Sequence, residues 1–171
     1  MEEGLRSLGW GSAQDAALGA VTDAREEVPA RVVRQERARF ELDTGRGRFV
    51  AAPAGRLRHL ATEAAELPVI GDWVLVAQPA HGQSEGVITT LLPRKSELSR
   101  RRVALGHEAQ VLAANVDVGL IVVPLDREPS LGLIDRALLM ARAGKVDPLV
   151  VLSKSDACSD TEREIERVRA H

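Results

Sequence analysis

The chain has little of several residues on which common folds and sites depend. It contains 171 residues, with a single cysteine, no tyrosine, two tryptophans and two phenylalanines. One cysteine, Cys158, excludes an internal disulfide framework and a cysteine-rich zinc site. No apolar run approaches the roughly 20 residues that a membrane helix needs, and the acidic N-terminus is unlike a secretory signal. We therefore expect a soluble cytoplasmic protein with no membrane partner.

Motifs for phosphate binding, metal binding and acyl transfer are also missing. The sequence has no GxxxxGK[ST] phosphate loop and no Asp-x-x-Gly to organise magnesium. No serine lies in a nucleophile-elbow pattern. The four histidines (His59, His81, His107 and His171) lie far apart, without the spacing of metal ligands. We expect neither a catalytic residue nor a metal site in this chain.

Charge is balanced overall but unevenly distributed. The net charge is −2, from 23 basic and 25 acidic side chains. Residues 29–60 nevertheless hold eight arginines against three acidic side chains, and residues 94–102 hold five basic groups against Glu97. Two basic segments in an acidic protein favour a local polyanion-binding surface over an ordinary solvated one.

The region after Pro29 alternates with the period of β-strands, following a short arm at the N-terminus. Within the arm (1–28), Ser12 is a candidate N-cap for a helix over 12–18, with Asp15 at the capping-box position, and we expect it to be loosely held. The short alternating segments and a turn over 81–85 predict a small OB-like barrel of five strands. The strands are expected at 31–33, 38–44, 47–53, 71–79 and 86–93.

The few aromatic side chains leave two interpretations of the barrel. Phe40 and Phe49 lie on facing predicted strands, where they could stack nucleic-acid bases. Filling the small interior is the favoured interpretation, because so few large side chains are available. RNA binding would then depend on arginine contacts to phosphates and would be sensitive to salt.

The pattern changes after the second basic segment. Residues 116–124 form a continuous apolar run, typical of a strand covered on both faces, and residues 147–153 predict a second one. Between them, Ser130 can cap a helix that Gly144 ends, and Ser159 with Glu162 predicts a capping box for a last helix. Strand, helix, strand, helix is the beginning of a parallel α/β sheet, here with an incomplete set of core partners.

The tetrapeptide Ser153-Lys154-Ser155-Asp156 follows the second of these strands. Open α/β sheets bind ligands at the carboxyl ends of their strands. There, Asp156 could accept two hydrogen bonds from guanine, whereas adenine would leave its carboxylate poorly paired. The stem of Lys154 could lie along the base. Taken alone, this motif is weak, because lysine and aspartate are common in ordinary strand-to-helix loops.

Several motifs together give a more specific resemblance, which extends from about Leu8 to Asp156. The chain resembles the RsgA (YjeQ/EngC) family of circularly permuted, ribosome-dependent GTPases. The motifs occur in this order: LGWGSAQ (8–14), PARV (29–32), GRLRH (55–59), PVIGDWV (68–74), LLPRKSELSR (91–100), QVLAANVD (110–117) and PLVVLSKSD (148–156).

The resemblance implies an OB domain that docks on small-subunit rRNA, followed by a GTPase domain whose base-recognition motif precedes its phosphate loop. It implies GTP or GDP as the ligand and places the phosphate loop, the magnesium site and a zinc-binding tail beyond this chain. Guanine would be bound by Ser153, Lys154 and Asp156. Ser153 departs from the family, which usually has asparagine there. The implied rRNA-binding residues are Arg31, Arg56, Arg58, Arg94, Lys95 and Arg100.

These observations suggest four regions and three hypotheses of function. The regions are an arm (1–28), an OB-fold RNA-binding domain (29–93), a basic linker (94–109) and a partial permuted GTPase domain (110–171). The first hypothesis is a GTPase of late small-subunit maturation, with the 171-residue chain inactive by itself. The second is an OB-type RNA-binding module without nucleotide hydrolysis, and the third is an adaptor that uses the exposed sheet edge.

Overall fold

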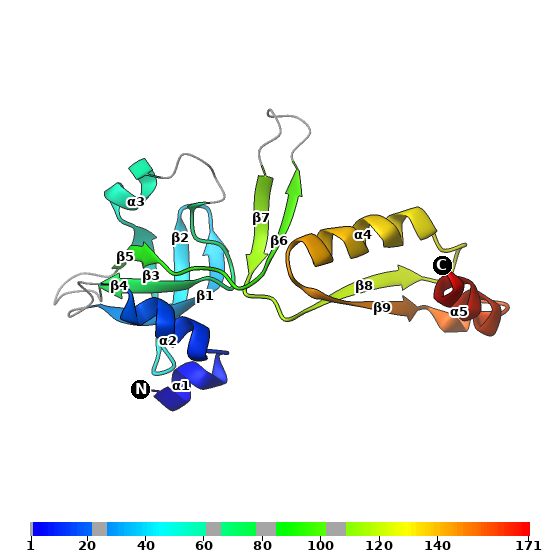
Figure 1. Cartoon of the computed structure of the whole chain (residues 1–171), viewed down its shortest axis with the longest axis horizontal. Helices are drawn as coiled ribbons and strands as arrows, with labels where there is room; N and C mark the ends of the chain where they lie inside the picture. Colours follow the sequence, from blue (N-terminus) through cyan, green and yellow to red (C-terminus); the bar gives the residue numbers. More distant parts are fainter. Residues whose placement is uncertain (1, 22–26, 61–65, 78–84, 102–108) are drawn as a thin grey trace. The chain divides into compact units, whose positions relative to one another are not determined.

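The computed structural model describes residues 2–21, 27–60, 66–77, 85–101 and 109–171 (Figure 1). They belong to two compact units, which divide between Asn115 and Val116. His81, His107 and most of the turn predicted over 81–85 lie outside the described residues.

Five strands of the first unit close into a barrel, which confirms the predicted OB-like barrel. Its strand order is β1-β2-β3-β5-β4, with β4 pairing back onto β1. The β3–β5 pair is parallel and the other pairs are antiparallel. The strands are β1 (Val28–Glu36), β2 (Arg39–Asp43), β3 (Arg48–Pro53), β4 (Trp73–Ala77) and β5 (Gly86–Leu91).

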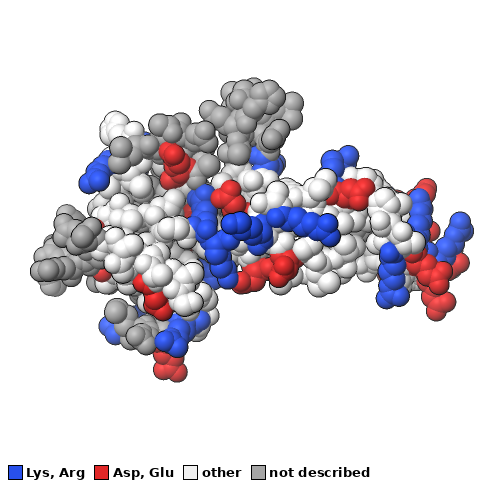
Figure 2. Space-filling view, in the orientation of Figure 1, with Lys and Arg blue, Asp and Glu red and all other residues white. Residues whose placement is uncertain are grey.

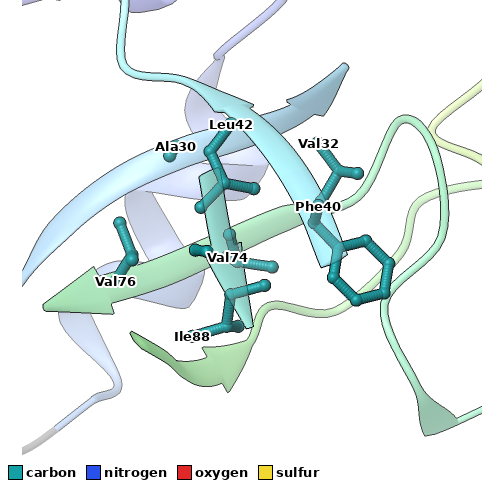
Figure 3. Close-up of a cluster of buried hydrophobic side chains, with 8 residues drawn as sticks. Ala30, Val32, Phe40, Leu42, Val74, Val76 and Ile88 are labelled. Atoms are coloured by element: carbon teal, nitrogen blue, oxygen red, sulfur yellow. The ribbon is translucent and has the colours of Figure 1, made fainter. Parts of the chain in front are cut away.

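Apolar side chains at alternate positions of the strands fill the barrel interior (Figure 3). Phe40 is 3% exposed and belongs to this cluster, while Phe49 packs against it from a partly buried position. The expectation that these rings fill the barrel is therefore confirmed. The buried cluster comprises Ala30, Val32, Phe40, Leu42, Ala51, Val74, Val76 and Ile88.

The N-terminal arm packs firmly on the barrel, so the expectation of a loose arm is wrong. Its helices are α1 (Glu2–Ser7) and α2 (Ser12–Gly19). Strand β4 is buried on both faces: Val74 and Val76 face the interior, and Trp73 and Leu75 form a second cluster with Leu5 of the arm. The arm covers apolar side chains that the barrel alone would leave in water.

The start of α2 also differs from the prediction. Gly11, not Ser12, is the N-cap residue, and its amide donates to the side-chain oxygen of Gln14 at 3.0 Å. Asp15 instead accepts a hydrogen bond of 2.7 Å from the indole of Trp10. The carboxylate of Asp15, which the sequence pattern assigned to a capping box, therefore binds the indole of Trp10 instead.

Besides the barrel and the arm, the described part of the first unit contains a short helix and a hairpin. They are α3 (Gly55–Leu60), β6 (Glu97–Arg101) and β7 (Ala109–Ala114). Strand β6 lies inside the segment interpreted as a linker, and it pairs antiparallel with β7. Val111 and Ala114 of β7 are buried with Val69. The hairpin thus has a small apolar contact of its own with the segment that precedes β4.

The second unit is the predicted strand–helix–strand–helix. It contains β8 (Val118–Pro124), α4 (Leu131–Ala143), β9 (Asp147–Ser153), a 3-10 turn (Ser155–Ala157) and α5 (Thr161–Ala170). Strands β8 and β9 are parallel and in register along their length. Ser130 is the N-cap residue of α4, although its side chain makes no capping hydrogen bond, and the helix ends at Gly144 as expected. Ile134 and Ala141 of α4 are buried. The predicted fold class is confirmed in this unit as well.

Two details of the second unit correct the expectations. Strand β8 is not covered on both faces: Val118, Leu120 and Val122 are 53%, 62% and 58% exposed. The reason is that the contacts of α4 leave one side of this two-stranded sheet uncovered. Helix α5 is capped by Asp160 and not by Ser159, since Asp160 accepts from the amide of Arg163 at 3.1 Å. In the described ranges, no helix has both the length and the apolarity to cross a membrane.

Candidate guanine-binding and RNA-binding sites

The three predicted guanine-binding residues lie in one loop at the carboxyl end of β9. Ser153 is the last residue of the strand, and its carbonyl accepts from the amide of Leu125 at 2.8 Å. Lys154 has a left-handed backbone, with φ 57° and ψ 40°. Asp156 lies exposed on the 3-10 turn that follows. The loop therefore occupies the end of a parallel sheet where α/β folds bind ligands.

The ammonium of Lys154 forms an ion pair with Asp126, a residue that the sequence reasoning did not select. Asp126 lies just beyond the end of β8, next to Leu125. The hydrogen bond from Lys154 lowers the pKa of Asp126 despite a smaller opposing effect of desolvation. The available sequence signal was indirect: β8 and β9 are parallel neighbours, so residues that follow them meet at one edge.

A pocket of about 460 Å³ lies beside this loop. It is formed by residues 125–128, residues 157–159 and three side chains of α5, and it includes the half-buried free thiol of Cys158. Lys154 and Asp156 do not line it. Basic and acidic side chains alternate around α5 (Figure 2), and Arg167 pairs there with Glu128 at 2.6 Å. The acidic and basic side chains that line the pocket therefore balance one another, and the pocket has no strong net charge of either sign.

Two of the predicted RNA-binding arginines are held inside the first unit. Arg31 donates to the carbonyls of Leu8 and, at 3.2 Å, Asn115. Its guanidinium also lies 5.5 Å from the ring centroid of Trp73, within the range of a cation–π contact. Arg31 therefore connects the arm, the barrel and the end of β7.

Arg94 is the second internally held arginine. Its side chain is 13% exposed, and it forms a bidentate pair of 2.8 and 2.9 Å with Asp72, whose side chain is fully buried. It also donates to Leu67 at 3.1 Å and to Glu97 at 3.2 Å. Burial acts to lower the pKa of Arg94, but the two carboxylates more than offset this and raise it, so the guanidinium remains charged.

Asn115 completes this group of contacts at the end of the first unit. The residue is 3% exposed, and its amide donates to Ser96 at 2.8 Å. Its side chain accepts from the amide of Lys95 at 3.1 Å and donates to the carbonyl of Gly71 at 3.0 Å. The GDW, PRKS and AANVD motifs thus meet in space.

The other four predicted RNA-binding residues lie on the surface. Arg56 and Arg58 are exposed on α3, and Lys95 and Arg100 are exposed around β6. Elsewhere on the barrel the positive charge is partly neutralised, since Arg39 pairs with Glu85 and Arg48 with Asp43. The structure therefore separates exposed basic side chains from those that hold the fold. Within the described ranges, no three potential metal ligands come together.

Comparisons with known proteins give one family. The RsgA GTPase family model matches residues 91–171. A protein of Opitutus terrae named small ribosomal subunit biogenesis GTPase RsgA is 38% identical over 96% of this chain and 47% of its own length. One of the same name from Syntrophotalea carbinolica is 35% identical over 92% of this chain and 44% of its own length. The chain thus spans about half the length of the curated relatives it matches.

Solved structures show the same fold. YjeQ from Thermotoga maritima superimposes with a TM-score of 0.59 and 25% identity, over 84% of this chain and 46% of that one. YloQ, described as a circularly permuted GTPase, gives a TM-score of 0.57 at 18% identity, over 88% of this chain and 48% of its own. The combination of the barrel with the partial α/β unit is therefore also found in solved structures. On these sequence and structure matches, the chain belongs to the RsgA GTPase family.

Proposed function

We propose that this chain supplies the RNA-binding barrel and the base-recognition loop of a cytoplasmic GTPase that assists late maturation of the small ribosomal subunit. One observation carries the proposal. A closed OB-like barrel and a Ser-Lys-Ser-Asp loop at a parallel strand end occur together in a chain that matches ribosome-biogenesis GTPases over more than nine-tenths of its length.

In the base-recognition loop, Asp156 accepts the ring N–H and exocyclic amine of guanine, and the stem of Lys154 lies along the base. The exposed position of Asp156 leaves its carboxylate accessible to such a ligand. Ser153 supports the loop through its carbonyl, which accepts from Leu125. The shorter Ser153 side chain has fewer hydrogen-bonding groups than asparagine and so constrains the loop less.

On the RNA side, the exposed residues Arg56, Arg58, Lys95 and Arg100 contact phosphates of rRNA. Arg31 and Arg94 act indirectly, because their guanidinium groups hold the arm and residues 94–97 in place. This arrangement agrees with the interior position of Phe40, which leaves phosphate contacts more important than stacking on that ring. The proposed regions are the arm (1–28), the OB domain (29–93), the basic segment (94–109) and the partial GTPase domain (110–171).

Binding of purified small ribosomal subunits at several salt concentrations tests the RNA proposal. The double variant Arg56→Ala/Arg58→Ala should weaken binding and reduce the slope of log affinity against log salt by about two. The matched control is Arg142→Ala/Arg169→Ala, which removes two exposed arginines from the second unit. Equal affinities for the two double variants would contradict an RNA-binding surface at α3.

A second candidate is an RNA-binding module without nucleotide recognition. One observation favours it: the pocket beside the loop is not lined by Lys154 or Asp156. Titration with GMP and AMP, followed by NMR of the backbone amides, separates the two candidates. Shifts around residues 153–157 with GMP and not with AMP support base recognition. Identical responses to the two nucleotides would leave only the RNA-binding module.

A further inference from the structure

The loop after β8 is physically joined to the base-recognition loop. The amide of Leu125 donates to the carbonyl of Ser153 at 2.8 Å, which extends the pairing of the two parallel strands to their carboxyl ends. Asp126 is the next residue, so its carboxylate is held close to the residue that follows Ser153. That residue is Lys154, and the two side chains form an ion pair across 28 positions of sequence.

The backbone of Lys154 is also unusual. A left-handed conformation at a residue other than glycine costs about 1–2 kcal/mol and persists only when surrounding contacts hold it. Here the residue is flanked by the strand pairing at Ser153 and by the 3-10 turn, in which Ala157 donates to the Lys154 carbonyl at 3.1 Å. The backbone is therefore fixed on both sides, and the remaining freedom lies in the long side chain.

The ion pair is too exposed to contribute much to stability. The Lys154 and Asp126 side chains are 55% and 37% exposed, and pairs of this kind contribute about 0–1 kcal/mol. Its main effect is on conformation, because a free lysine side chain samples many rotamers. With its ammonium at Asp126, the stem of Lys154 is restricted to the space between the ends of β8 and β9.

We propose that Asp126 is a positioning residue of the guanine site: it holds the ammonium of Lys154 so that the stem is already placed along the base. This inference rests on the proposed function, and it adds a residue from a different strand end to the Ser-Lys-Ser-Asp loop. Asp126 acts through Lys154 and does not itself contact the nucleotide.

The test is GMP and AMP binding by the full 171-residue chain, measured from amide shifts of residues 153–157. Asp126→Asn keeps the shape of the side chain and removes its charge. We expect GMP affinity to fall about twofold to fivefold, toward that for AMP, as stem placement is lost. Asp126→Glu should recover part of the GMP selectivity, and the thermal midpoint should be unchanged in both variants.

Glu128→Gln is the matched control. It removes the same charge from the same loop and breaks an exposed pair with Arg167, but it does not involve Lys154. GMP affinity should remain at the parental value. Parental selectivity in Asp126→Asn, or an equal loss in Glu128→Gln, would overturn the positioning role alone. Failure of the unsubstituted chain to distinguish GMP from AMP would instead overturn the proposed guanine site and this role with it.

Discussion

The carboxylate of Asp72 and the guanidinium of Arg94 face each other as a two-pronged ion pair, with hydrogen bonds of 2.8 and 2.9 Å. Asp72 is fully buried, and it also accepts from the amide of Val69 at 2.8 Å. The pair joins the loop before β4 to the segment after β5. Arg94 comes from a basic segment that the sequence pattern associated with RNA binding. In the structure its side chain instead holds the fold together.

Removing one partner of this pair should strongly destabilise the first unit. Asp72→Asn leaves a largely buried guanidinium with only the more exposed carboxylate of Glu97 as counter-charge, and breaking a buried pair costs about 3–5 kcal/mol. Arg94→Lys should cost less, because it keeps the charge but loses the second hydrogen bond. Urea unfolding followed by tryptophan fluorescence measures both. A loss below about 1 kcal/mol for Asp72→Asn would mean that the pair behaves like a surface salt bridge.

Gly71 should not tolerate a side chain. Its φ is 88°, and a Cβ there would overlap the carbonyl oxygen of Ala114. Gly71→Ala should therefore destabilise the chain by about 1–3 kcal/mol and increase amide exchange along β7. Gly132→Ala in α4 is the control, since a Cβ there meets no atom within 4 Å. Equal stability of the two variants would show that the approach of Gly71 to Ala114 is unimportant.

Docking of the arm should depend on Trp10. The Trp10 and Trp73 rings meet edge to face with centroids 4.9 Å apart, and the Trp10 indole donates to Asp15. Trp10→Ala should reduce the free energy of unfolding by about 1–3 kcal/mol through lost apolar burial and ring contact. Limited proteolysis should then cut the arm faster than in the unsubstituted chain. Unchanged cleavage would indicate that Leu5 alone is sufficient.

Stability should decrease at acidic pH in part through Asp43. Burial acts to raise the pKa of Asp43, but hydrogen bonds from the Gly45 amide and from Arg48 more than offset this and lower it. With the folded-state pKa below the unfolded one, the contribution is present above about pH 4 and is lost as pH falls through the folded value. Asp43→Asn should therefore flatten the acid limb of stability against pH. A limb of unchanged slope would contradict this assignment.

The 171-residue chain should not hydrolyse GTP by itself. Its sequence contains no phosphate loop to hold the β- and γ-phosphates, so base recognition alone provides no means of phosphoryl transfer. Phosphate release should equal the no-protein blank, both for this chain and for Asp156→Ala. Turnover that is abolished by Asp156→Ala would show that another segment binds the phosphates.

Local patterns in the chain were sufficient for much of the architecture. Strand alternation between 29 and 93 predicted the five-stranded barrel, and the apolar runs around Ser130 and Gly144 predicted the β8–α4–β9 order. The Ser-Lys-Ser-Asp loop was selected from its position after a predicted strand, and it lies at the carboxyl end of β9. These features depend on the chemistry of residues close together in sequence, so they can be read before any long-range contact is known.

The uses of individual polar side chains could not be read in that way. Arg94 and Arg56 look alike in a basic segment, but the first meets Asp72, 22 residues away, and the second lies exposed on α3. Arg31 reaches Asn115, 84 residues away, and Asp126 meets Lys154 only because β8 and β9 end side by side. Closure of the barrel and parallel strand pairing create these neighbours. Burial then determines whether each charge holds the fold or remains at the surface for a ligand.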